Sequence, residues 1–380
     1  MVEELGVSVE SNVRSAPSET GSVQLRAAAE SEVARLDPLR DEGWDGFVQQ
    51  HTLGTVFHTS AWLAVLQEAY GYSPTAYVLL DGAGRIEAGL VVCLVRSRLT
   101  GTRLVSLPFC DQAPPLTDTP EQLGRLTRAA IDEVRGGAAS RLEIRGGAFG
   151  STAETLGLQP HVAYYNYTIP LRQGIAQLEE SLHPSTKRAI RKARREGVTV
   201  RLGESWDDVA KFYELNVWTR KKHGVIPQPR RFFEALYRNL LSQGKGFLLL
   251  AETAGRVVAG DLILASNATA FYKFNASDER YLHLRPNNLL LWTAVELCHD
   301  QGYEFFDLGR CSIESDGLRR FKQQWGSREA ELAYYHYPSP SGVNTVGEQG
   351  AKYRLMQMLV RSAPQRMLEA AGGLLYRHLG

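Results

Sequence analysis

The sequence predicts an α/β protein in which a mixed β-sheet is flanked by helices and one structural unit occurs twice. The chain has 380 residues, of which 43% are hydrophobic and 22% charged, a balance typical of globular proteins. A single core stops growing at roughly 250 to 300 residues, so this chain is long enough for two. The other two observations are an internal repeat and the same order of helical and strand patterns around each copy.

The repeat lies in residues 77–95 and 248–266, which align at an offset of 171. Each copy consists of two apolar segments joined by a short polar turn, a pattern that predicts a β-hairpin. The identical positions are Leu79, Ala83, Gly84, Arg85, Ala88 and Gly89 in the first copy, and Leu250, Ala254, Gly255, Arg256, Ala259 and Gly260 in the second.

An amphipathic helical stretch precedes each hairpin, and a strand, a helix and a further strand follow it. In the first half these three elements are expected at residues 104–109, 120–134 and 141–146, and in the second half at 270–276, 287–300 and 303–309. A hairpin followed by a crossover helix and a last strand predicts a mixed sheet. We place the first unit at residues 34–172 and the second at 173–338.

The two ends of the chain differ from these units. Residues 1–33 are rich in Ser, Glu, Ala and Gly and are predicted to form a mobile tail. Residues 339–380 are predicted to form a C-terminal helical tail, because apolar residues recur at helical spacing from Tyr353 to Val360 and Pro364 precedes a second short helix. Such a tail is compatible with contact at a membrane surface and with packing against its own domain.

Composition excludes several classes of protein. The 43 Lys and Arg residues balance 42 Asp and Glu, which excludes a histone-like or acidic-tail protein. The longest apolar run, Ala88–Val95, is too short to span a membrane, and the acidic N-terminus does not fit a signal peptide. The cysteines lack the spacing of metal or disulfide frameworks, so we expect reduced thiols, no metal and a cytoplasmic protein; they are Cys93, Cys110, Cys298 and Cys311.

Charge is segregated along the chain. Residues 172–231 hold 14 Lys and Arg against 7 Asp and Glu, whereas residues 1–50 hold 4 against 10. The basic residues crowd into 187–195 at helical spacing, and Lys187, Arg188 and Arg191 are candidates for contact with the phosphates of a substrate. A solvated helix face explains the same run equally well.

Several motifs occur in an order that indicates a family. They are HPSTKRAIRKARREGV (183–198), VWTRKKHG (217–224), FYKFNASD (271–278), LRPNNLLLWTAVE (284–296), FDLG (306–309) and SDGLRRFKQQWG (315–326). The chain resembles the Fem family (FemAB, FemX) of peptidoglycan-bridge aminoacyltransferases and the related BioF-like acetyltransferase domains, over residues 45–338. The resemblance implies tandem GNAT domains, the fold of acyl-CoA N-acyltransferases, that transfer an acyl or aminoacyl group to an amine without a metal.

In the Fem family the donor is an aminoacyl-tRNA and the acceptor a cell-wall precursor, and no cofactor is needed. GNAT enzymes that use acetyl-CoA carry glycines at the start of the crossover helix, where this chain has Asn288 and Leu290 after Arg285. Two alternatives remain: an acyl-CoA-dependent N-acyltransferase acting on an amino sugar in polysaccharide biosynthesis, and a non-catalytic binding protein. Arg285 is a candidate donor contact in either enzyme.

The resemblance also suggests catalytic residues. Phe321 and Lys322 match the Phe-Lys pair that Fem enzymes place at the reacting carbonyl, where an ammonium stabilises the negative charge on oxygen. An exposed helix lysine beside a core phenylalanine is the structural alternative. Asp111 lies near the position of an aspartate close to the acceptor in FemX-like enzymes, although a turn-capping role explains it more simply.

Three further residues are candidate substrate contacts. Tyr272 and Lys273 alternate in direction along a strand, so we expect one of them in the cleft, and the resemblance favours Tyr272. Trp218 and His223 are suited to stacking on a base or to meeting phosphate, but a buried tryptophan and a helix-ending histidine before Gly224 are equally consistent. The sequence lacks GxSxG, HExxH and Walker motifs, which argues against hydrolase, metalloprotease and NTPase functions.

Overall fold

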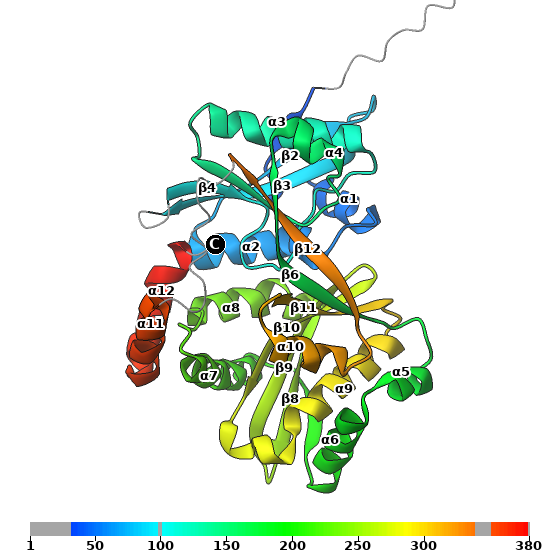
Figure 1. The fold of residues 1–380 in the computed structure, drawn as a ribbon, viewed down its shortest axis with the longest axis vertical. Coiled ribbons are helices and arrows are strands. Elements are labelled where there is room, and N and C mark those ends of the chain that lie inside the picture. Colours follow the sequence, from blue (N-terminus) through cyan, green and yellow to red (C-terminus); the bar gives the residue numbers. More distant parts are fainter. Residues whose placement is uncertain (1–31, 98–100, 339–350, 379–380) are drawn as a thin grey trace, which may run out of the picture. The chain divides into compact units, whose positions relative to one another are not determined.

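A computed structural model describes residues 32–97, 101–338 and 351–378 (Figure 1). The predicted N-terminal tail lies outside these ranges except for its last two residues, and so do residues 339–350 of the predicted C-terminal tail. Within the described ranges, the strands form a single sheet in the order β1-β2-β3-β4-β5-β12-β6-β11-β10-β9-β8-β7.

The strands are β1 (Ala34–Leu36), β2 (Pro74–Leu80), β3 (Ile86–Ser97), β4 (Gly101–Val105), β5 (Arg141–Arg145), β6 (Gln159–Pro170), β7 (Thr199–Gly203), β8 (Gly246–Thr253), β9 (Arg256–Ser266), β10 (Thr269–Ser277), β11 (Phe305–Ser312) and β12 (Arg328–Tyr337). The α-helices are α1 (Trp44–Gln50), α2 (Ser60–Tyr70), α3 (Pro120–Arg135), α4 (Ser151–Leu156), α5 (Ile175–Ser181), α6 (Pro184–Arg195), α7 (Trp206–His223), α8 (Arg230–Asn239), α9 (Pro286–Asp300), α10 (Asp316–Gln323), α11 (Ala351–Ser362) and α12 (Gln365–Leu375). Short 3₁₀ helices occur at η1 (Val56–His58), η2 (Leu241–Gln243), η3 (Glu279–Leu284) and η4 (Tyr376–His378).

The repeated sequence forms the two predicted hairpins, β2–β3 and β8–β9. The Ala-Gly pair of the repeat lies in their turns, where Gly84 and Gly255 have φ of 79° and 73°. This left-handed conformation favours glycine, which explains why the repeat retains it. Each half continues with an antiparallel strand and then a parallel one, and the predicted crossover helices between them are α3 and α9.

One predicted strand is misplaced, because β4 begins at Gly101 and shares only Leu104 and Val105 with the expected segment. The expected strand at 104–109 ends at Val105, because Leu107 and Phe109 adopt left-handed conformations with φ of 62° and 61°. Such values are incompatible with a strand and are unusual for residues with side chains.

The last strands of the two halves lie side by side in the middle of the sheet (Figure 1). β12, from the end of the second half, pairs with β5 of the first, while β6, which precedes the second half, pairs with β11. The two strands also pair with each other. Backbone hydrogen bonding therefore runs continuously from the first half to the second, and the proposed division at residue 172 follows directly after β6.

Helices cover both faces of the sheet and bury separate cores. On one face, α2 of the first half packs against α8 of the second, with the rings of Trp62 and Phe232 6.1 Å apart. On the other, α9 buries leucines and Trp292 against β8 and β9 in the second half, and α3 covers the first half. The shared α2–α8 core positions the first-half loop after β4 against strand β10.

Candidate active site

Strands β10 and β11 separate near the centre of the sheet. They pair in parallel over only three residues, Thr269–Phe271 with Phe305–Asp307, and irregularities in register follow in both strands. Where they separate lies a cavity of about 10 Å³, which we call the fork cavity. It is lined by Phe57, Asp111, Gln112, Phe271, Tyr272, Lys273, Asp307 and Gly309.

Asp307 is a buried carboxylate at this cavity. Its Oδ1 accepts a hydrogen bond from the Gly309 N–H (2.6 Å), and its Oδ2 accepts from Asn166 Nδ2 (2.8 Å) and Gln112 Nε2 (3.2 Å). Burial raises the pKa of Asp307 to about 6, although the bonds from Asn166 and Gly309 favour the ionised form. A carboxylate with a pKa close to neutral is suited to accepting a proton in a reaction at physiological pH.

Asp111 faces the fork cavity from the first half. Its Oδ2 accepts from the Arg310 N–H at 3.1 Å, and its Oδ1 lies 3.5 Å from Arg310 Nε. Burial alone would raise the pKa of Asp111. The positive charges of Lys273 and Arg310 outweigh this effect and hold the pKa below its ordinary value. The turn-capping interpretation is therefore wrong: the carboxylate binds a backbone 199 positions away. Gly309 permits this approach, since a Cβ there would lie 2.7 Å from Asp111 Oδ2.

Two cations hold the loop that carries Asp111. Lys273 Nζ donates to the Phe109 carbonyl at 2.5 Å, and Arg145 Nη1 donates to the Cys110 carbonyl at 3.2 Å. Tyr334 Oη donates to the Asp111 carbonyl at 2.6 Å. These bonds account for the left-handed residues in this loop, because such conformations persist only where surrounding contacts fix them.

Lys322 lies in α10 with only 5% of its surface exposed. Its Nζ donates to the carbonyls of Gly309 (2.6 Å) and Arg310 (2.8 Å), at the bulge of β11. Burial lowers the pKa of Lys322, while Asp111 and Asp307 oppose the change. Lys322 is thus a buried ammonium beside the fork, and the structural alternative of an exposed helix lysine beside a core phenylalanine is wrong, since Phe321 is the more exposed of the two.

A larger cavity, of about 480 Å³, lies at the start of α9. We call it the α9 pocket; its lining residues are Ser185, Thr186, Arg188, Ala189, Lys192, Arg285, Asn288, Phe321 and Gln324. Arg188 and Lys192 are one turn apart on α6, so both reach the same side. Arg285 precedes α9 with a left-handed φ of 65°, and no side chain caps the helix. Three cations and an uncapped helix start make this pocket suited to an anionic ligand.

Comparisons with known proteins identify the fold. Residues 182–323, which span α6 to α10, match the family model described as an acetyltransferase (GNAT) domain. Among solved structures, FemX is similar at 16% identity with a TM-score of 0.65, covering 77% of this chain and 94% of that one. Residues 182–323 form a GNAT-type acyltransferase domain, and the chain has a Fem-like fold.

Two other solved structures share the fold of this acyltransferase. L-PGS from Bacillus licheniformis is 11% identical with a TM-score of 0.53, covering 88% of this chain and 98% of that one. A tandem GNAT protein from the clavulanic acid biosynthesis pathway is 12% identical with a TM-score of 0.50, covering 80% and 98%. The predicted tandem GNAT fold is thereby confirmed. No curated protein sequence matches the chain.

The structure brings together several predicted site residues of the acyltransferase. Arg188, Arg285 and Phe321 line the α9 pocket, and the next residue, Lys322, turns to the fork. Lys187 instead donates to the Glu180 carbonyl at 3.0 Å, and Arg191 is exposed and does not line the pocket. The basic run of α6 therefore contributes a pocket-facing side, through Arg188 and Lys192, and a solvated side.

Trp218 and His223 lie apart from these residues on α7. Trp218 is 48% exposed, so the interpretation as a buried tryptophan is wrong, and its Nε1 donates to Gln365 Oε1 of α12 at 3.0 Å. His223 ends α7 before Gly224, whose φ is 69°, as one of the two interpretations predicted. Burial lowers the pKa of His223, and neighbouring cations lower it further.

Tyr272 and Lys273 both line the fork cavity. The expectation that only one of them faces the cleft is wrong, because the register shift between Tyr272 and Phe274 interrupts the alternation of the strand. Tyr272 Oη donates to Asp261 Oδ1 at 3.1 Å. Asp261 is fully buried, and burial raises its pKa to about 7 against the bonds from Asn275 and Tyr272.

Sequence reasoning did not select Lys273, Asp307 or Asp261 as site residues. The signal for the first two lay in the motifs FYKFNASD and FDLG, where a charged residue interrupts an apolar strand. Their roles depend on the bulges in β10 and β11, which strand patterning does not predict. Asp261 replaces the leucine found at the equivalent position of the first repeat, Leu90.

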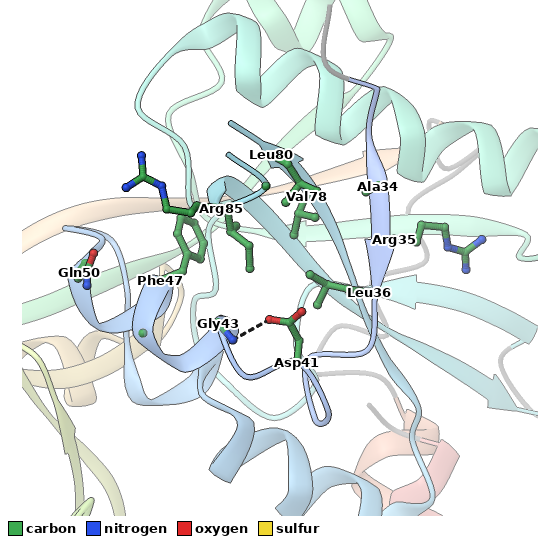
Figure 2. Close-up of a pocket in the computed structure, with 13 residues that line it drawn as sticks. Ala34, Arg35, Leu36, Asp41, Gly43, Phe47, Gln50, Val78, Leu80 and Arg85 are labelled. Carbon is green, nitrogen blue, oxygen red and sulfur yellow. Dashed lines mark hydrogen bonds between the residues drawn. The ribbon is translucent and has the colours of Figure 1, made fainter. Parts of the chain in front are cut away.

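Another cavity, of about 570 Å³, lies in the first half beside β1 and the β2–β3 turn (Figure 2). Its charged groups already have partners: Asp41 Oδ1 accepts from the Gly43 N–H at 3.0 Å, Arg85 pairs with Asp81, and Arg35 pairs with Glu133. Figure 2 shows the two arginine side chains directed away from Asp41. We therefore assign the chemistry to the second half despite the size of this cavity.

Across residues 32–97, 101–338 and 351–378, no cluster of His, Cys, Asp and Glu side chains has the arrangement of a metal site. In the same ranges, no helix combines the length and apolar character that a membrane span requires.

Proposed function

We propose that this protein transfers an aminoacyl group from aminoacyl-tRNA to an amine of a peptidoglycan precursor or a related cell-envelope acceptor, in the cytoplasm. The observation that carries the proposal is the α9 pocket, where Arg188, Lys192 and Arg285 meet Phe321, the neighbour of Lys322. The fold shared with FemX and with L-PGS supports aminoacyl transfer in the cell envelope.

The composition of the pocket favours a tRNA donor. Arginine and lysine side chains bind phosphate oxygens with little sequence dependence. Asn288 lines the pocket where enzymes that bind the pyrophosphate of CoA closely carry glycine, so a bulky group replaces the open backbone. We assign the phosphates at the acceptor end of tRNA to Arg188, Lys192 and Arg285, with the ester directed past Phe321.

Lys322 is assigned to the carbonyl of the ester. Attack by the amine nitrogen on the carbonyl carbon places negative charge on the carbonyl oxygen, and the C–O bond to the tRNA ribose then breaks. An ammonium has three N–H groups, and two of those on Lys322 are donated to Gly309 and Arg310. The third is available for the oxyanion, in a position that the other two bonds fix.

Asp307 is assigned to the proton of the attacking amine. Its pKa of about 6 leaves it mostly ionised at neutral pH and able to accept a proton. The same proton can then pass to the departing ribose oxygen, so that the amide and a free hydroxyl are the products. Gln112 and Asn166 hold the carboxylate in place through its Oδ2.

The acceptor is assigned to the first-half side of the fork. Asp111 is held in its ionised form by Lys273 and Arg310, and an ionised carboxylate there attracts an ammonium group of the acceptor. Tyr272, on the opposite strand, lines the same cavity and supplies an aromatic contact.

An acyl-CoA-dependent N-acyltransferase acting on an amino sugar is the second candidate. The uncapped start of α9 and Arg285 favour it, because both groups also suit the pyrophosphate of CoA. The tandem GNAT protein of the clavulanic acid pathway has the same fold. A non-catalytic binding protein would retain the α9 pocket and show no turnover with either donor.

Donor binding separates these candidates. The full-length protein is titrated with a mixture of aminoacyl-tRNAs in filter binding and with acetyl-CoA in calorimetry. We expect saturable tRNA binding that Arg285→Glu weakens by about tenfold or more, with a strong dependence on salt. Arg128→Glu, on the first-half crossover helix α3, is the matched control and should bind like the wild type.

Saturable binding of acetyl-CoA without tRNA binding would replace the proposed donor by the second candidate. The acceptor is tested by mass spectrometry of cell-wall precursors from cells with and without the gene. A precursor that differs by the mass of an amino acid supports the proposal. If no precursor differs in mass, the cell-wall acceptor is wrong.

A further inference from the structure

The C-terminal helices α11 and α12 are fastened to the rest of the protein through one side. Val360, Leu368 and Tyr376 are 6%, 3% and 7% exposed. Tyr376 Oη donates to the Ile226 carbonyl at 2.8 Å, and Arg231 Nη2 donates to the Gly373 carbonyl at 3.1 Å. The described part of the tail therefore packs against its own protein, one of the two contacts that the sequence left open, and its other side faces away from α7 and α8.

That outer side carries the most exposed large apolar side chains of the described residues. Met358, Leu359, Met367 and Leu374 are 62–67% exposed, whereas the other large apolar side chains reach at most 48%. Met367, Ala370 and Leu374 recur at the spacing of one helical face, opposite the buried Leu368. We call Met358, Leu359, Met367 and Leu374 the C-terminal apolar face.

The charge around this face is positive. Residues 351–380 contain five Lys and Arg against a single acidic residue, Glu369. Arg361 and Arg377 are exposed, and Glu369 accepts a hydrogen bond from Gln365 Nε2 at 3.1 Å. Exposed methionine and leucine side chains beside cations fit the boundary between acyl chains and anionic headgroups. A second copy of the chain would bring like charges together, which disfavours self-association.

We propose that the C-terminal apolar face docks on the surface of an anionic lipid bilayer, with α11 and α12 lying along the membrane. Helices of 12 and 11 residues are too short to cross a bilayer, so the contact is peripheral. The inference does not depend on the donor or the acceptor of the proposed reaction.

Vesicle sedimentation tests the proposal with the full-length protein. Vesicles of phosphatidylcholine with phosphatidylglycerol should sediment the wild type, and vesicles of phosphatidylcholine alone should do so much more weakly. The double variant Met367→Ser/Leu374→Ser should lower the partition coefficient by about tenfold or more, because two side chains no longer enter the acyl region. Both positions face outward, so the variant is expected to fold, and circular dichroism checks it.

A matched control and a charge variant complete the test. Leu53→Ser/Leu202→Ser removes two apolar side chains, each 44% exposed, outside the C-terminal helices, and should sediment like the wild type. Arg361→Glu should weaken binding to the anionic vesicles only. Absence of wild-type binding, or an equal loss in both double variants, overturns the proposal. A smaller oligomer formed by the Met367→Ser/Leu374→Ser variant, without vesicle binding by the wild type, would assign the face to a second copy instead.

Discussion

The crossover helices of the two halves begin in different ways. At the start of α3, the Thr119 side chain accepts from the Gln122 N–H at 3.2 Å, and the Gln122 side chain accepts from the Thr119 N–H at 3.3 Å. At the start of α9, Arg285 adopts a left-handed conformation, no side chain caps the helix, and the α9 pocket lies beside it. A side chain therefore satisfies an N–H group at the start of the first helix, whereas no side chain caps the second.

The two repeated hairpins, β2–β3 and β8–β9, also differ in that only the second carries a buried polar group at one equivalent position. Leu90 of β3 and Asp261 of β9 occupy equivalent positions of the repeat, and both are buried. Leucine stabilises the first hairpin through apolar contact. Asp261 is a carboxylate whose Oδ2 has no hydrogen-bond partner among the described residues, although Oδ1 accepts from Tyr272 and Asn275. One unit has thus been stabilised as a scaffold, while its copy retains costly polar groups, as binding and catalytic sites do.

The largest expected effect comes from Lys322→Met. Loss of the ammonium should lower the rate of transfer by about 100- to 1,000-fold, the usual effect of removing one group that stabilises an oxyanion. Single-turnover assays with the donor that binds measure it, with Lys222→Met as the control because Lys222 lies on the surface. Equal rates for Lys322→Met and the wild type would place the chemistry outside the second-half fork.

The next largest effect is expected in the pH dependence of the free energy of unfolding, through Asp261. Since its pKa is raised to about 7, the folded state holds a proton that the unfolded state releases between about pH 4 and 7, and stability falls as pH rises through this window. The Asp261→Asn variant has no carboxyl at this position and does not lose stability in this way. The difference between its free energy of unfolding and that of the wild type should therefore shift in favour of the variant by about 2 to 4 kcal/mol between pH 4 and pH 8. Urea unfolding at several pH values measures it.

Glu314→Gln, at an exposed position, serves as the control for this series and should follow the wild type at every pH. Parallel curves for Asp261→Asn and the wild type would show that burial in the second hairpin does not raise the pKa of Asp261.

A smaller effect is expected for Lys273→Met. Without the bond to the Phe109 carbonyl, the loop that carries Asp111 should open more often and expose the buried thiol of Cys110. Labelling of Cys110 by N-ethylmaleimide, followed by mass spectrometry, should accelerate by about tenfold or more, as expected for a lost charged hydrogen bond. Cys298, a buried residue of α9, is the internal control, and equal acceleration at both thiols would indicate general unfolding instead.

The smallest effect is expected at the first crossover helix. Thr119→Ala removes the cap of α3 and should lower the free energy of unfolding by about 1 kcal/mol, measured by urea denaturation. Donor binding should not change, because this helix start is satisfied internally. A loss of donor affinity in Thr119→Ala would contradict the assignment of the donor to the second half alone.

Much of the fold and part of the site could be predicted from sequence. The repeat of Ala83-Gly84-Arg85 in residues 254–256 identified the doubled unit, because a hairpin turn with a left-handed glycine is a local requirement. Arg188, Arg285 and Phe321 could be selected because their motifs are short and continuous. Lys273 and Asp307 were missed, since a strand pattern assumes regular alternation and both residues lie at irregularities of register.

The sequence by itself determined the order of elements, the two hairpins, the crossover helices and the basic run of α6, since all of these follow from local conformation and periodicity. Only the tertiary structure decided that β12 pairs with β5 and β6 with β11, and that Asp111 of one half meets Arg310 and Lys273 of the other. Such contacts join residues more than 130 positions apart. They depend on which surfaces pack together, and local patterns do not encode that choice.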